Sequence, residues 1–169
     1  MNIAVLTAEG KVIVRTDNTL VRDSADFYVP DFVKSVRISP VVFVEISSPC
    51  RCCDPKFASR HLGLAGAGAL LHCCEEESES ACIDRTTYIS GPRIPYAEIG
   101  GKELRFTGRK IGLPSRETIE DAFGRINSRV YLRTGDLICI ELEAPSETGA
   151  GSAMDCILDG EKSFSFELR

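Results

Sequence analysis

The chain has 169 residues, 43% of them hydrophobic and 27% charged, which fits one globular domain over residues 1–169 and excludes disorder and fibrous repeats. The net charge is −5 and the 20 basic residues are scattered rather than gathered in a stripe, which argues against a nucleic-acid partner. The apolar runs are far shorter than the roughly 20 residues of a membrane helix, so we expect no membrane span. The chain also starts without the basic region and cleavage site of a secretory signal, which predicts a cytoplasmic location.

Short strands separated by turn residues dominate the first half of the chain. The runs Ile3–Leu6 and Val12–Arg15 flank a Glu-Gly pair and predict a hairpin. The β-branched and aromatic run Val41–Ile46 predicts a buried strand. Because proline cannot donate a hydrogen bond to a ladder, we expect Pro40 at the first position of this strand.

The middle of the chain predicts a short helix, a strand rich in glycine and a loop. Asp54 followed by proline is typical of an N-cap and a first helical position, so a helix is predicted from there to about Leu62. The glycines of HLGLAGAGALL match no phosphate-binding pattern and indicate a buried strand whose neighbours pack closely. The acidic run Glu75–Ser80 predicts a solvated loop.

The second half adds one long helix and two hairpins. A turn at Gly100–Gly101 predicts that 94–99 and 102–106 pair. Apolar residues at helical spacing predict a helix over Ser115–Ser128, and Leu137–Leu142 predicts a strand. The pair Asp159–Gly160 predicts a final hairpin between 154–158 and 163–168.

Eight cysteines are many for this length, and most of them cluster with two histidines between the clusters. A zinc or redox site is one interpretation, built from Cys50, Cys52, Cys53, Cys73 and Cys74 with His61 or His72 nearby. We do not interpret Cys50-x-Cys52-Cys53 or the vicinal Cys73–Cys74 as the two-residue-gap pair that presents both sulfurs to one metal. Reduced thiols packed as small apolar residues are therefore favoured over a metal site or a disulfide scaffold.

One pair of acids has the spacing of metal ligands. Glu141 and Glu143, two residues apart, would project from the same face of a strand. No third carboxylate is evident beside them, so this pair is a secondary candidate for a metal site.

Several segments resemble, in the same order, segments of the fumarylacetoacetate hydrolase family. The first is TDNTLVRDSADFYVPDF at 16–32, similar to a family segment that ends in PDF. The others are FASR at 57–60, AEIGGK at 97–102, the helix 115–128 followed by YLRTGDLI at 131–138, and ILDGEK at 157–162. The resemblance implies a mainly β, α+β domain with few short helices, built on a rolled mixed sheet, and a homodimer. It also implies a shortened and diverged member, because the chain starts near the catalytic core of the family.

The family binds Mg²⁺ or Mn²⁺ through three carboxylates and uses the metal to hold an oxo-acid. The positions of these carboxylates map to Ser39, Val41 and Leu70, of which two cannot ligate a hard cation at all. The family lysine maps near Glu75, and the substrate-binding TGTP maps to 140–143. The elements that shape the fold are kept, and those of the metal and substrate site are not.

The sequence therefore favours a non-catalytic member of this fold, a binding or structural homodimer with no resident cofactor and an unidentified small-molecule ligand. The alternative is a hydrolase, decarboxylase or isomerase of a 2-oxo or 3-oxo acid, with Mg²⁺ or Mn²⁺ held at a relocated site that includes Glu141 and Glu143. A homodimer is expected because the apolar strands need cover on both faces while only one substantial helix is predicted.

Overall fold

The computed structural model describes all 169 residues and contains two β-sheets. The strands of the larger sheet are β1 (Asn2–Leu6), β2 (Val12–Thr16), β3 (Leu20–Val21), β4 (Val36–Ile46), β5 (Leu62–His72), β6 (Thr87–Ile89), β7 (Ile94–Pro95), β10 (Leu137–Glu141) and β11 (Ser146–Thr148). The smaller sheet comprises β8 (Leu104–Phe106), β9 (Arg109–Ile111), β12 (Ala153–Leu158) and β13 (Glu161–Glu167). The helices are α1 (Glu77–Ser80) and α2 (Arg116–Asn127), with 3₁₀ helices η1 (Asp17–Thr19), η2 (Pro55–Arg60) and η3 (Tyr96–Gly101).

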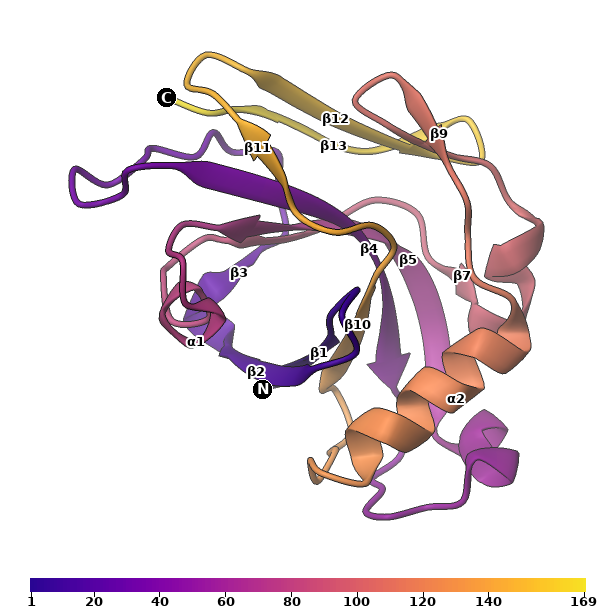
Figure 1. Cartoon of the computed structure of the whole chain (residues 1–169). Helices are drawn as coiled ribbons and strands as arrows, with labels where there is room; N and C mark the ends of the chain where they lie inside the picture. Colours follow the sequence, from indigo (N-terminus) through magenta and orange to yellow (C-terminus); the bar gives the residue numbers. More distant parts are fainter.

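The larger sheet curls into a roll. Its main path runs β2-β1-β10-β4-β5-β6-β3, with β1–β10 and β3–β6 parallel and the other pairs antiparallel. The two end strands, β2 and β3, are consecutive in the chain and joined only through η1. The sheet therefore bends round until its two ends lie close together, as Figure 1 shows. This confirms the mainly β, rolled mixed sheet that the resemblance implies.

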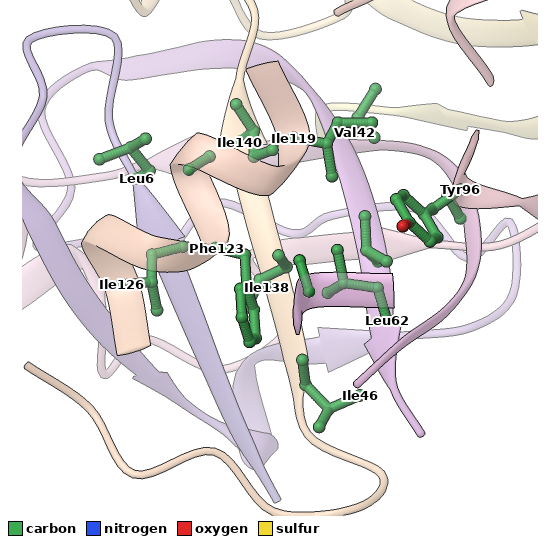
Figure 2. Close-up of a cluster of buried hydrophobic side chains, with 14 of the residues drawn as sticks. Leu6, Val42, Ile46, Leu62, Tyr96, Ile119, Phe123, Ile126, Ile138 and Ile140 are labelled. Atoms are coloured by element: carbon green, nitrogen blue, oxygen red, sulfur yellow. The ribbon is translucent and has the colours of Figure 1, made fainter. Parts of the chain in front are cut away.

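Three apolar clusters hold the fold together. One fills the interior of the roll and consists of Ile3, Val5, Val41, Phe43, Leu70, Ile89, Leu137 and Cys139. A second lies between the outer face of the sheet and α2, η2 and η3 (Figure 2). The third lies between the roll and the smaller sheet, where Tyr88 stacks on Phe166 at 3.8 Å. Both faces of the central strands are thus buried within one chain.

The helix predicted over 115–128 is confirmed as α2, with Ser115 as its N-cap. The Ser115 hydroxyl accepts a 3.3 Å hydrogen bond from the Thr118 amide, as expected for a residue in this position. Its apolar face buries Ile119, Phe123 and Ile126 against the sheet (Figure 2). Gly124 lies within this helix, and a Cβ there would lie 2.6 Å from the Pro55 side chain, so the glycine lets η2 approach.

Most predicted strands are confirmed, but Pro40 does not begin its strand. β4 starts at Val36, and Pro40 lies inside it. On one edge of β4, the pairing with β10 ends at Val41 and the pairing with β11 begins at Ile38. Pro40 lies between these two ladders, and its carbonyl accepts a hydrogen bond from the Leu142 amide on that edge. Because neither ladder includes Pro40 on this edge, no ladder hydrogen bond requires the N–H that proline lacks.

The hairpin predicted around Gly100–Gly101 is wrong. Residues 96–101 form η3, which buries Ile99 completely against the α2 cluster, and β7 pairs with β5 instead. The turn that joins two strands here is Thr107–Gly108, between β8 and β9, where both residues have positive φ. The family segment matched to 97–102 was therefore misplaced.

Part of the loop predicted at 75–80 forms the single helical turn α1.

A helix that crosses a bilayer needs about 20 mostly apolar residues. None of the helices of this chain combines the length and the apolar character needed to cross a membrane.

Candidate functional site

The three positions matched to the family carboxylates come together inside the roll. Ser39 and Val41 are two residues apart on β4, so their side chains project from the same face of the sheet. Leu70 on β5 lies opposite Ser39. All three residues are 0% exposed. The side chains at these three positions supply one hydroxyl and two hydrocarbon groups.

A polar cluster lies beside these positions, at one end of the interior. The Ser39 hydroxyl donates a 2.8 Å hydrogen bond to Glu141 Oε1, and His72 Nε2 lies 3.0 Å from the same oxygen. The Ser39 Oγ and the His72 Nε2 are 3.1 Å apart. The other Glu141 oxygen accepts from the Ala8 amide at 3.0 Å. Strands β4, β5 and β10 thus each contribute one member of a closed triangle.

This triangle does not have the geometry of a nucleophilic triad. In such a triad the serine and the carboxylate contact opposite nitrogens of the histidine, so that the ring can pass a proton along. Here both Ser39 and Glu141 contact Nε2, and the buried Nδ1 of His72 has no partner. Ser39 is also completely buried. The arrangement is that of a buried hydrogen-bonding network.

The protonation of Glu141 follows from two opposing influences. Burial is the larger single one and raises the pKa of this carboxyl. Hydrogen bonds from His72, the Ala8 amide and Ser39 together outweigh it, so the pKa of Glu141 lies below its ordinary value. Glu141 is therefore an anion at neutral pH, with both of its oxygens already bonded within the protein.

Arg15 supplies a buried positive charge in the same interior. This residue projects inward from β2 and is 1% exposed. Its guanidinium donates to the Leu71 carbonyl at 3.0 Å and to the carbonyl and hydroxyl of Thr86 at 3.2 and 3.1 Å. The space that a metal centre would need is thus filled by hydrocarbon and by polar groups that are bonded to one another.

A small cavity of about 140 Å³ opens above Glu141 at this end of the roll. Charged residues dominate its wall, which is formed by Thr7, Ala8, Glu9, Lys11, Arg37, Glu75, Glu77, Glu141 and Pro145. Glu75, which takes the place matched to the family lysine, is part of that wall. The charge at this position is therefore negative.

The proposed pair of Glu141 and Glu143 does not form a shared site. Glu141 lies inside the roll, whereas Glu143 lies past the end of β10 and forms a 2.9 Å ion pair with Arg109. The sequence argument assumed that both residues lie on one strand. Because β10 ends at Glu141, the alternation of side chains along the strand does not extend to Glu143.

The sequence argument considered His72 only as a neighbour of the cysteine clusters, and it did not consider Arg15. The alternation of β2 placed Arg15 on one face with Ile13, and this signal could have identified it as inward-facing. His72 ends a strand that is otherwise apolar, but nothing local in the sequence connects it with Glu141. That contact depends on the pairing of β4 with both neighbours.

A second cluster of chemically competent side chains lies outside the roll. Cys50 and Cys53 form a disulfide, and potential ligand atoms of these cysteines and of His61 lie within 4.8 Å of one another. It is the one place where three such donors gather. Our interpretation of the cysteine spacing was therefore wrong for this pair, because two residues do separate Cys50 from Cys53. The other six cysteines are unpaired, and Cys73, Cys139 and Cys156 are buried, as predicted for packed thiols.

Comparisons with known proteins identify the fold. No family model and no curated protein matches the sequence. A protein from Yersinia pestis CO92 assigned to the fumarylacetoacetate hydrolase family superposes with a TM-score of 0.80 at 16% identity, over 99% of this chain and 92% of the other. Fumarylpyruvate hydrolase from Pseudomonas aeruginosa, solved in complex with Mn²⁺ and pyruvate, gives a TM-score of 0.77 at 14% identity, over 100% and 90%. The 2-hydroxyhepta-2,4-diene-1,7-dioate isomerase from Mycobacterium marinum gives 0.80 at 13%, over 99% and 73%. The chain has the fold of the fumarylacetoacetate hydrolase family.

Proposed function

We propose that this chain is a non-catalytic protein on the fumarylacetoacetate hydrolase fold and acts as a binding or structural homodimer. One observation carries the proposal. The positions matched to the metal-binding carboxylates are Ser39, Val41 and Leu70, and all are completely buried in the packed interior of the roll. A pseudoenzyme is the expected result when a fold is kept and its ligands are replaced by hydrocarbon.

The donors in the interior do not fit Mg²⁺ or Mn²⁺. A hard divalent cation takes about six oxygen ligands, most of them carboxylates, carbonyls or water. The only interior carboxylate beside the matched positions is Glu141, and its oxygens accept from Ser39, His72 and the Ala8 amide. Arg15 adds a positive charge on the same face. We therefore derive no reaction step through a metal here.

The alternative, a metal-dependent enzyme acting on a 2-oxo or 3-oxo acid, needs a relocated site. Glu141 is its one plausible anchor, because it borders the cavity at the end of the roll together with Glu9, Glu75 and Glu77. Against it, a metal at Glu141 would have to displace hydrogen bonds that the fold already makes.

Titration calorimetry with MnCl₂ and with MgCl₂ separates the two functions. We expect no heat of binding in the micromolar range, and no turnover of an acylpyruvate or oxaloacetate when Mn²⁺ is added. Micromolar binding that is lost in Glu141→Gln would replace the proposal with the enzymatic alternative. The thiol groups do not confuse this measurement, because hard cations prefer oxygen to sulfur.

The assembly and location are parts of the same proposal. The exposed aromatic side chains Tyr28 and Phe32, 70% and 69% exposed, support a second copy of this chain as the partner. A reducing compartment such as the cytoplasm suits a chain with six unpaired cysteines. The even spread of basic residues supports the absence of a nucleic-acid partner.

A further inference from the structure

We propose that Cys50, Cys53 and His61 form a zinc site when the two thiols are reduced, and that the Cys50–Cys53 disulfide is the oxidised, zinc-free form of the same site. The site lies outside the roll, between the end of β4 and the start of β5. It is independent of the family metal positions and of the proposed function.

The ligand set has the chemistry and the spacing of a zinc site. Two thiolates separated by two residues can bind one metal ion together, and Zn²⁺ prefers sulfur and imidazole nitrogen. The Cα atoms of Cys50 and Cys53 are 6.1 Å apart, and ligand atoms of the two cysteines and of His61 lie within 4.8 Å of one another. Rotation about the side-chain bonds of the reduced cysteines is enough to open room for an ion between them.

The main chain around the cysteines is held in place before any metal binds. Cys50 exchanges two backbone hydrogen bonds with Leu132, at 2.9 and 3.0 Å. The side chain of Asn127, 1% exposed, accepts from the Cys53 amide at 2.8 Å and donates to the Cys53 carbonyl at 3.0 Å. A loop fixed at both cysteines loses little entropy when it binds a metal.

His61 is oriented by contacts that leave one ring nitrogen free. Its Nδ1 lies 2.9 Å from the Ser48 hydroxyl and 3.3 Å from the Ser48 carbonyl, and its ring stacks on Phe123 at 6.0 Å. We assign the ring proton to Nδ1, because donation to a carbonyl is the usual outer contact of a zinc-bound histidine. The Nε2 lone pair then remains for the metal.

The protein supplies three ligands and leaves the fourth position to water. Cys50 is buried, whereas Cys53 and His61 are half-exposed, so solvent reaches one side of the cluster. Three protein ligands with one open position are typical of zinc sites that exchange a ligand.

The two forms interconvert by thiol–disulfide exchange with a low-molecular-weight disulfide such as oxidised glutathione. One cysteine thiolate attacks a sulfur of that disulfide and expels a thiolate, and the second cysteine thiolate then displaces the other half. The cysteines lose two electrons, the external disulfide is reduced to two thiolates, and Zn²⁺ is released because its sulfur ligands are consumed. Because Cys53 is only half-buried whereas Cys50 is buried, the thiolate of Cys53 is the more accessible one for the first attack.

The test uses the full chain, reduced with a phosphine that is then removed, incubated with ZnCl₂ and desalted. We expect one zinc ion per chain by elemental analysis and native mass spectrometry, and none after treatment with oxidised glutathione. Cys53→Ser and His61→Gln should each lower the zinc content at least about tenfold at limiting zinc. Cobalt in place of zinc should give the intense absorption of tetrahedral thiolate coordination, which disappears in Cys53→Ser.

Matched controls identify the ligands. Cys52→Ser and Cys82→Ser remove exposed thiols that are outside the proposed set and should leave the zinc content unchanged. Reduced protein that retains no zinc would overturn the proposal, and so would full zinc content in both Cys53→Ser and His61→Gln. Loss of zinc in Cys52→Ser would overturn the ligand set.

Discussion

The guanidinium of Arg15 on β2 donates a 3.0 Å hydrogen bond to the main-chain carbonyl of Leu71 on β5, although β1, β10 and β4 separate these strands in the sheet. The same group donates to Thr86, just before β6. One buried side chain therefore crosses the interior and connects the end strand β2 with β5 and with the residue before β6. The end strand β3 pairs with β6 over only two residues. The hydrogen bonds of Arg15 are therefore a main part of what holds the roll closed.

Replacing Arg15 with methionine tests how much the connection stabilises the roll. Arg15→Met leaves the Leu71 carbonyl and the Thr86 hydroxyl without the hydrogen bonds that Arg15 donates, and leaves Glu141 without a nearby positive charge. We expect the free energy of unfolding to fall by about 3–5 kcal/mol, as for other buried charges that lose a partner. Urea unfolding followed by circular dichroism measures it. Arg22→Met, at an exposed arginine, should change it by less than about 0.5 kcal/mol. Equal effects of the two substitutions would contradict this role.

The pH dependence of stability should report on Glu141. Its pKa is lower in the folded chain than the ordinary value of 4.5, so its ionised form stabilises the fold above that pH. This contribution is lost as the pH falls through the folded pKa, because the protonated carboxyl cannot accept from Ser39 and His72 as the anion does. Glu141→Gln should be less stable by about 1.5–3 kcal/mol at pH 7, and its stability should fall less steeply below pH 4.5. Urea midpoints between neutral pH and acid measure both effects. Parallel pH profiles of the two proteins would show that the carboxylate does not contribute in this way.

The glycines of β5 should be required for packing. A Cβ at Gly68 would lie 2.6 Å from the Tyr88 carbonyl and 3.1 Å from the Val41 side chain, and backbone on β6 cannot move away cheaply. Gly68→Ala should therefore destabilise the fold by about 1–3 kcal/mol through overpacking. Gly112→Ala is the matched control, because a Cβ there meets nothing within 4 Å. It should be neutral or slightly stabilising, since alanine restricts the unfolded chain. Thermal unfolding of both variants decides, and a neutral Gly68→Ala would contradict the close approach of β5 and β6.

Local signals predicted the parts of this fold that depend on local contacts. The turn at Asp159–Gly160 joins β12 and β13 with both residues at positive φ, as the dipeptide indicates. The helix α2 follows from its cap and its apolar spacing. The strand β5 is predicted because the glycines of HLGLAGAGALL match no phosphate-binding pattern and are typical of a buried, closely packed strand.

What the sequence could not supply depends on contacts between distant segments. Pro40 lies within a strand because β10 and β11 leave a gap opposite it, and nothing near Pro40 in the chain encodes that gap. The segment 96–101 becomes helical because Ile99 packs beside α2 and the Tyr96 hydroxyl donates to Glu120. The resemblance mapped the family carboxylates to Ser39, Val41 and Leu70, but it did not indicate the His72–Glu141 contact, which requires three strands in register.

The structure changes the physical argument for a homodimer. The expectation rested on sheet faces that lacked cover, yet the smaller sheet, α2 and the curl of the roll bury both faces of β4 within one chain. The support now comes from the segment before β4, which projects from the body in Figure 1 and carries Tyr28 and Phe32. These aromatic side chains border a cavity of about 430 Å³ that also includes Phe27, Pro30 and Ile83. Aromatic side chains beside a hollow are typical of the centre of an interface.

Light scattering at micromolar concentration should give a mass near twice the 18.5 kDa of one chain. Tyr28→Ser combined with Phe32→Ser should raise the dissociation constant at least about tenfold, because exposed aromatic anchors contribute much of the binding energy of an interface. The substitutions should leave the unfolding midpoint of the monomer unchanged, since both side chains are largely exposed. Tyr131→Ser removes a tyrosine that is 48% exposed in a different segment and should leave the dissociation constant unchanged. A wild-type protein of 18.5 kDa would show that the chain is a monomer. A dimer that tolerates the double substitution would place the interface on another surface.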